Sequence, residues 1–211
     1  FNSRLGLKAG MMRRAVVLVG TFAGFLAGVL PLVGQTSDER ALSAAEQQDW
    51  LAIGQITYGG AVGAAICTGT LVAVDLVLTA AHCVSHDGVP MRAVDIQFAA
   101  GWRAGKSAAI RYGEEIILAG LSDDKPRALA QDVALIVLDG PIDGDVVQPL
   151  ALAAPNAPTD NYSLIGYRRD VPDVIRRNDA CDLKGTQGAV LLLRCRVVSG
   201  NSGAPVLLQR N

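Results

Sequence analysis

Short β-type segments separated by turn residues are the feature that most limits what this chain can fold into. From Trp50 onward, runs rich in Val, Ile, Leu and Thr recur between clusters of Gly, Pro, Asn and Asp. This spacing is typical of an all-β sandwich or barrel. We expect strands in two groups, the first at 51–58, 65–74, 76–79, 93–98, 109–118 and 133–138, and the second at 162–167, 174–183, 189–197 and 204–208.

A connection rich in Pro, Ala and Asn separates the two groups of strands. No long amphipathic helix interrupts the β pattern. We therefore predict two β-domains joined near Pro149, one at 49–147 and one at 148–211.

Composition limits the partners of the chain. Half of its 211 residues are apolar, which is enough to bury a sizeable core. The 19 Lys and Arg residues nearly balance the 20 Asp and Glu residues, which leaves a formal net charge of −1. No global field would attract nucleic acid or an anionic membrane, and we expect neither as a partner.

The first residues carry a targeting pattern. Arg13 and Arg14 precede an apolar run at 15–33 in which Thr21 is the only polar side chain. This pattern predicts a secretory signal, and the alternative is a retained membrane anchor because the run approaches spanning length. We expect residues 1–35 to comprise upstream residues and the signal peptide, on a secreted or periplasmic protein with no stable membrane association unless that segment is retained. The polar stretch 36–48 is predicted to be a propeptide or linker that forms no core.

The chain contains four cysteines, Cys67, Cys83, Cys181 and Cys195. In an oxidising compartment an even number favours disulfides over metal ligation or catalysis. Three pairings are possible. Spacing favours Cys67 with Cys83 and Cys181 with Cys195, because each pair then encloses one compact segment, and a loop of that length contributes about 3 kcal/mol in the chain-entropy model.

The strongest local motif is Leu-Thr-Ala-Ala-His-Cys at 78–83. An apolar strand ends there in small residues that allow a tight turn, and the turn presents the imidazole of His82. Cys83 can tie this turn to the strand that holds Cys67. A lone histidine would more often be structural, but this whole motif would fix a base in space.

Two further motifs supply an acid and a hydroxyl. Asp132 opens an apolar strand, and a carboxylate that lies beside an imidazole can accept its Nδ1 hydrogen and stabilise the imidazolium. Gly200 and Gly203 flank Asn201 and Ser202, and glycines permit a strained turn that exposes a serine beside converging N–H groups. Taken singly, each motif could be an ordinary turn.

In these three motifs, and in the order His82, Asp132, Ser202, the chain resembles the chymotrypsin-like (trypsin-fold) serine peptidases. The resemblance implies an all-β fold of two antiparallel Greek-key barrels and a serine endopeptidase acting on a polypeptide substrate. Ser202 would be the nucleophile, and the amides of Gly200 and Ser202 would form the oxyanion hole. The resemblance implies a monomer with no cofactor and no metal. In the family, strands after the nucleophile complete the second barrel and the pocket, so we expect a second barrel truncated at its C-terminal end.

The chain departs from the animal members of this family at two positions. Asn201 stands where many carry an aspartate that pairs with a newly freed N-terminal ammonium. The Gly-Asn-Ser-Gly form is similar to that of bacterial glutamyl endopeptidases, so we predict activation without that ion pair. Arg196 stands where trypsins carry the aspartate that selects Lys or Arg. It could select acidic side chains or simply point into solvent.

Two other interpretations remain open. A non-catalytic relative could keep the fold as a binding module. A metal site at His82 and His86 is conceivable because the two are one helical turn apart, but a third ligand and the glutamate of an HExxH motif are missing. His86 lies in a polar loop, where we expect it to be solvated.

Overall fold

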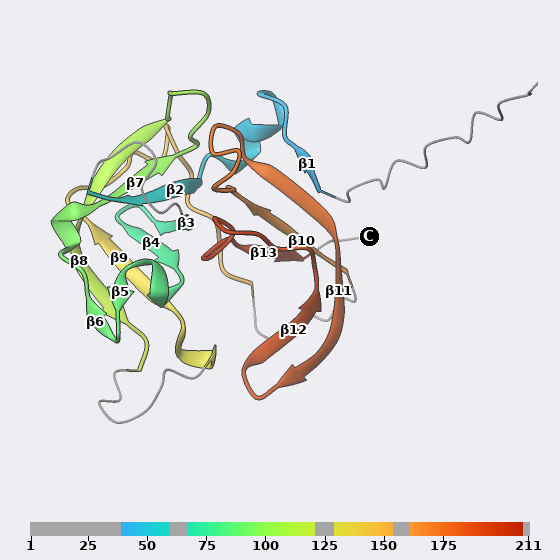
Figure 1. Cartoon of the computed structure of the whole chain (residues 1–211). Coiled ribbons are helices and arrows are strands. Elements are labelled where there is room, and N and C mark those ends of the chain that lie inside the picture. Colours follow the sequence, from blue (N-terminus) through green and yellow to red (C-terminus); the bar gives the residue numbers. More distant parts are fainter. Residues whose placement is uncertain (1–38, 60–66, 121–128, 154–160, 209–211) are drawn as a thin grey trace, which may run out of the picture. The chain divides into compact units, whose positions relative to one another are not determined.

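The computed structural model describes residues 39–59, 67–120, 129–153 and 161–208, which belong to one compact unit and are almost entirely β-structure (Figure 1). The strands are β1 Glu39–Ala41, β2 Ile53–Tyr58, β3 Cys67–Ala73, β4 Leu76–Thr79, β5 Ser85–His86, β6 Val89–Pro90, β7 Ile96–Ala100, β8 Ala109–Leu118, β9 Ala134–Leu138, β10 Asn161–Gly166, β11 Arg176–Gln187, β12 Val190–Arg194 and β13 Val206–Leu208. Short 3₁₀ turns lie at η1 Glu46–Trp50, η2 Ala81–Cys83, η3 Ala93–Asp95 and η4 Leu129–Gln131.

The predicted signal segment at 1–35 lies outside the described residues. Within the described ranges, no helix has the length and apolarity needed to cross a bilayer.

Six strands form a closed barrel in the order β2-β3-β4-β9-β8-β7. Each neighbouring pair is antiparallel, and closure leaves no open edge. Side chains alternate across the wall, as in β9, where Ala134, Ile136 and Leu138 are buried and the residues between them are half-buried. These side chains fill the interior together with Phe98, which is fully buried.

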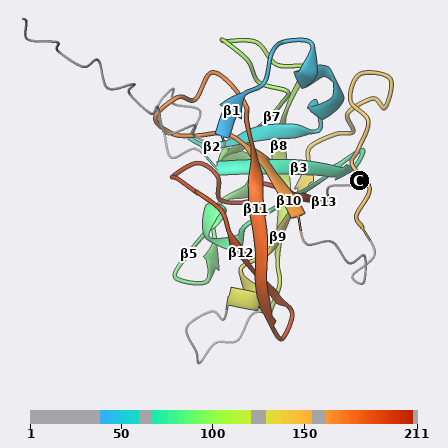
Figure 2. The same cartoon turned by 90° about the vertical axis from the view of Figure 1, so that its right-hand side faces the viewer.

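The second group of strands forms a five-stranded sheet. β11 pairs with β10 along one edge and with β1 and β12 along the other, and β10 also pairs with β13 (Figures 1 and 2). In the described part of the chain this sheet is open. The predicted all-β fold is confirmed, and the strands predicted at 76–79 and 109–118 coincide with β4 and β8.

The prediction that 36–48 forms no core is wrong for its described part. β1 pairs with β11 in a register that places Glu39 opposite Asn178. Leu42 follows it, is 2% exposed and belongs to an apolar cluster that joins the barrel to the second sheet. The other buried members of that cluster are Ile53, Ile165, Tyr167 and Ile175. A strand of three residues is too short to show an alternating apolar pattern in the sequence. It forms because the edge of β11 supplies its hydrogen bonds.

Both disulfides have the pairing that spacing favoured. Cys67–Cys83 joins β3 to the turn that carries His82, and Cys181–Cys195 joins β11 to the segment after β12. Each half of the described fold therefore holds one covalent cross-link.

Candidate active site

Strand register brings His82 and Asp132 together. In the antiparallel pair β4–β9, Thr79 at the end of β4 lies opposite Ala134 at the start of β9. The residues just after β4 and just before β9 must therefore emerge at the same end of the barrel. His82 comes three residues after Thr79, and Asp132 comes two residues before Ala134.

Asp132 holds His82 through both of its carboxylate oxygens. The backbone N–H of His82 donates to Oδ1 over 2.9 Å, and its ring Nδ1 lies 2.7 Å from Oδ2. Because an ionised carboxylate only accepts hydrogen bonds, Nδ1 carries the hydrogen and Nε2 of the neutral ring is left as the acceptor. The His82 side chain is 56% exposed, so this nitrogen is accessible to a substrate.

The Gly-Asn-Ser-Gly segment forms a tight turn that requires its glycines. Gly200 and Gly203 have φ values of +104° and +76°, a backbone region that disfavours side chains. Inside the turn, the Asn201 N–H donates to the Val198 carbonyl over 3.0 Å, and the Ala204 N–H donates to the Asn201 carbonyl over 2.9 Å. We call residues 199–204 the nucleophile loop, after the role predicted for Ser202.

Thr68 on β3 fastens the nucleophile loop to the barrel. Its N–H donates to the Ser202 carbonyl over 2.8 Å, and its hydroxyl donates to the Gly200 carbonyl over 2.8 Å. The same hydroxyl oxygen accepts the Tyr167 N–H over 2.9 Å. Thr79 donates to the Thr68 carbonyl over 2.9 Å. Thr68 is fully buried. Its N–H and hydroxyl join the two halves, and its carbonyl is held by Thr79 within the barrel.

Close packing places the nucleophile loop beside the histidine turn. A Cβ on Gly203 would clash with Thr68 and Thr79 and would lie 3.0 Å from the Ala80 nitrogen. Asp132, Ala80 and Gly203 also border one pocket of about 550 Å³. Within the described residues Ser202 makes no side-chain hydrogen bond to His82. Such catalytic hydrogen bonds commonly tighten only when a substrate is present.

Asn201 has neutral partners for its side-chain amide. Nδ2 donates to the Tyr167 carbonyl over 2.9 Å, and Oδ1 accepts the Val198 N–H over 2.9 Å. The carboxamide thus fills the space of an aspartate while matching a carbonyl on one side and an N–H on the other. That activation needs no N-terminal ammonium stays a prediction.

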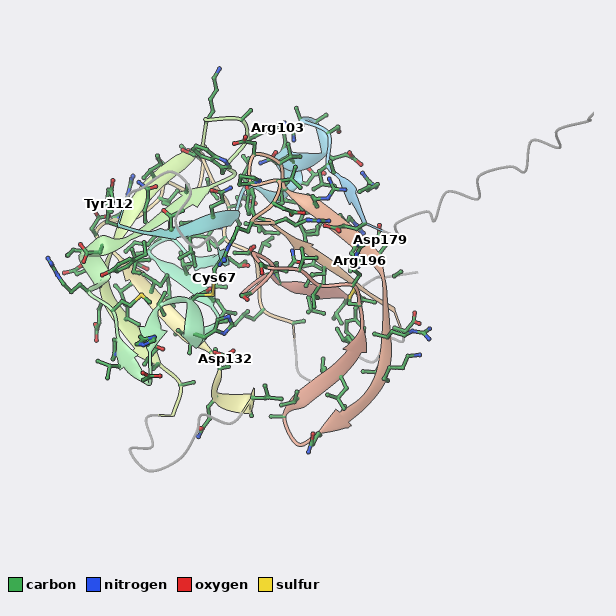
Figure 3. The ribbon with its side chains drawn as sticks, in the orientation of Figure 1. Cys67, Arg103, Tyr112, Asp132, Asp179 and Arg196 are labelled. Carbon is green, nitrogen blue, oxygen red and sulfur yellow. A yellow bond between two sulfur atoms is a disulfide. The ribbon has the colours of Figure 1, made fainter. Side chains whose placement is uncertain are left out.

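The other residues that the sequence singled out have different surroundings. Arg196 is exposed, and Figure 3 shows it beside the second sheet, apart from Asp132 and Cys67. The His86 side chain is 85% exposed and lies 3.3 Å from Asp87, as expected for a solvated loop. Cys67 and Cys83 lie near His82, but their sulfurs form a disulfide and offer no thiolate to a metal.

Sequence reasoning missed the part played by Thr68. Its partners Gly200 and Tyr167 lie about 100 residues or more away along the chain. A buried threonine in a β-strand has no local signature that separates a hub of hydrogen bonds from ordinary packing.

The closed barrel, the second sheet and the His–Asp pair at their junction define a trypsin-like serine protease fold. Residues 67–211, most of the chain, match the sequence profile of the trypsin-like peptidase domain. The chain therefore belongs to that family. A comparison with curated protein sequences finds no match.

Solved structures agree with this assignment of the fold. The thermostable serine protease AL20 from an extremophilic microorganism is 23% identical with a TM-score of 0.61, and the match covers 77% of this chain and 81% of that one. A Glu endopeptidase is 20% identical with a TM-score of 0.60, covering 81% and 80%. The protease Anisep from Arthrobacter nicotinovorans is 19% identical with a TM-score of 0.58, covering 76% and 78%. At these identities the similarity establishes the fold alone.

Proposed function

We propose that this chain is a secreted or periplasmic serine endopeptidase that hydrolyses peptide bonds through an acyl-enzyme on Ser202. The single observation that carries the proposal is the double hydrogen bond from His82 to Asp132, at the end of the barrel against which the nucleophile loop packs. A serine hydroxyl is a weak nucleophile unless such an oriented base removes its proton.

The reaction follows from the roles of three side chains. His82 Nε2 takes the proton from the Ser202 hydroxyl while Oγ bonds to the scissile carbonyl carbon. The resulting oxyanion is stabilised by the N–H groups of Gly200 and Ser202. The C–N bond then breaks, His82 delivers the proton to the leaving amine, and the acyl group remains on Ser202. Asp132 holds the ring and stabilises its positive charge.

Water completes the cycle by the same steps in reverse. His82 removes a proton from water as the water oxygen attacks the ester carbon, and the bond to Ser202 Oγ breaks as the proton returns to that oxygen. The carboxylic acid product leaves, and the free enzyme is restored.

Export is supported by the two disulfides, which persist in oxidising compartments. Because Arg196 is exposed, it does not support a pocket for acidic side chains, and we assign no preference for the residue before the cleaved bond.

Labelling with a fluorophosphonate probe tests the proposal. We expect covalent capture of the wild-type chain, loss of capture in Ser202→Ala, and strongly reduced capture in His82→Ala, with the labelled peptide identified by mass spectrometry. If the folded wild-type chain is not captured, it is not a serine hydrolase, and the binding-module interpretation gains support. Capture that survives Ser202→Ala would show that the nucleophile is misassigned.

A further inference from the structure

Strand β1 brings a buried carboxylate against two arginines. Glu39 is only 7% exposed, and its oxygens lie 2.7 Å from Arg168 Nη1 and 3.2 Å from Arg176 Nε. Arg168 also binds both oxygens of Asp170, over 2.8 and 2.5 Å. The hydrogen bond from Arg168 holds the pKa of Asp170 below its usual range. A buried charge is tolerated only when it is paired in good geometry, so this cluster fixes where Arg168 lies relative to β1 and β11.

Arg168 belongs to the segment that directly supports the nucleophile loop. The Tyr167 carbonyl accepts Asn201 Nδ2, and the Arg169 N–H donates to the Ser199 carbonyl over 2.8 Å. Between these two contacts, a Cβ on Gly200 would lie 2.8 Å from Arg168 Cα. The backbone of Arg168 is thus in direct contact with that of Gly200.

The contact from Arg169 sets the direction of the Gly200 N–H. A peptide unit is planar and trans, so the carbonyl of Ser199 and the N–H of Gly200 point in opposite directions. Because Arg169 binds the carbonyl, the N–H is turned away from the 167–169 segment. Movement of this segment would allow that peptide to rotate and would misdirect a donor of the proposed oxyanion hole.

We propose that Glu39 is a positioning residue for the oxyanion hole, which holds the Gly200 N–H in place through Arg168 and the adjoining Arg169 backbone. This inference rests on the proposed function. The nucleophile loop itself carries the neutral Asn201. The ion pair that holds the loop is Glu39 with Arg168, between β1 and the 167–169 segment that supports the loop. β1 therefore acts as a structural part of the catalytic apparatus.

The test compares Glu39→Gln with wild type in the full chain, at temperatures where circular dichroism shows both to be folded. The rate constant for acylation by a fluorophosphonate, and kcat for a peptide substrate, should each fall about tenfold or more, because loss of one oxyanion donor outright costs about 10²- to 10³-fold. KM should change much less than kcat, since transition-state contacts are the ones affected. Glu39→Asp keeps the charge and should recover part of the rate.

A matched control lies on the same N-terminal segment. Glu46 makes an exposed ion pair with Arg40 over 2.8 Å and hydrogen bonds with Ser43, and none of these contacts involves the nucleophile loop. Glu46→Gln makes the same chemical change, and we expect wild-type acylation from it.

Two arginine variants separate positioning from general stabilisation. Arg168→Gln removes the guanidinium that pairs with Glu39, from the residue whose backbone contacts the loop. It should slow acylation as much as Glu39→Gln does, which keeps the test valid if Glu39→Gln does not fold. Arg176→Gln removes the other partner, should lower the unfolding temperature, and should leave acylation close to wild type.

Wild-type acylation in folded Glu39→Gln or Arg168→Gln would overturn the inference. A rate that falls in all three variants in proportion to their thermal destabilisation would overturn it as well, since that pattern is purely structural. If the wild-type chain itself is not acylated, the proposed function fails first, and this inference fails with it.

Discussion

The barrel and the second sheet are stabilised by different means. The barrel closes on itself and encloses one apolar cluster that includes Phe98, Ile136 and Leu71. The described second sheet is open and has smaller apolar clusters. It carries several ion pairs, at Glu39 with Arg168, Arg177 with Asp179 and Arg194 with Asp182.

The two parts of the candidate site are also held in place by different means. His82 and Asp132 are placed by barrel register and a disulfide, both of which are rigid. The nucleophile loop is placed by hydrogen bonds from Thr68, Asn201 and the 167–169 segment. We therefore expect changes to barrel packing to act mainly on stability, and changes to polar contacts of the second half to act mainly on turnover.

The largest predicted effect tests whether the two halves act as one catalytic unit. His82→Ala on the barrel and Ser202→Ala on the second half should each lower kcat by about 10⁶-fold, as in a comparable triad. The double variant should be no slower than either single variant, because each alone disables the same step. Losses that multiply in peptide-hydrolysis assays would show that the two residues work independently.

Barrel packing should have the next largest effect. Phe98→Ala should lower the free energy of unfolding by about 3–5 kcal/mol, since it empties a fully buried site, whereas Leu164→Ala in the second sheet should cost about 2 kcal/mol. Chemical denaturation measures both. Equal costs would contradict the view that the barrel core contributes more to stability than the small cluster around Leu164.

Two threonines on β3 offer a sharper comparison. Thr68→Val removes the hydroxyl that joins Gly200 to Tyr167, and leaving buried polar groups unpaired costs about 1–3 kcal/mol. If about 1.4 kcal/mol of this cost also raises the free energy of the transition state, kcat/KM should fall about tenfold. The buried Thr70 hydroxyl has no hydrogen-bond partner within the described residues, so Thr70→Val should leave stability unchanged or raised. If Thr70→Val loses more stability or more kcat/KM than Thr68→Val does, Thr68 does not have the role assigned to it here.

The smallest effect concerns the β11–β12 hairpin. The hydrogen bond from Arg194 holds the pKa of Asp182 below its ordinary value. A carboxyl whose pKa is lower in the folded state stabilises the fold above its unfolded pKa, and this contribution disappears as the pH falls through the folded-state value. Asp182→Asn should therefore melt slightly below wild type at pH 6, and the difference should disappear as the pH falls through the folded-state pKa. Because this pair is exposed, a large shift would be unexpected.

Local motifs predicted more of the barrel than of the second half. The strand ending at Thr79, the strand starting near Ala134 and the Cys67–Cys83 disulfide were all expected from residues close together in the sequence. The contact of Asp132 with His82 was also expected, because the family resemblance assigns both residues to one site. Strand β1 was missed, because its partners on β11 lie far along the chain and leave no local pattern.

The sequence by itself indicated most of the β-structure, favoured one pairing of the cysteines, and supplied the imidazole, carboxylate and hydroxyl that are candidates for catalysis. Each of these depends on residue type and on short spacings, which are local properties of the chain. The tertiary structure alone decided that Thr68 joins the nucleophile loop to the barrel and that Glu39 is buried between Arg168 and Arg176. Hydrogen bonds and ion pairs between such distant residues depend on how whole sheets pack, and no short stretch of sequence encodes that packing.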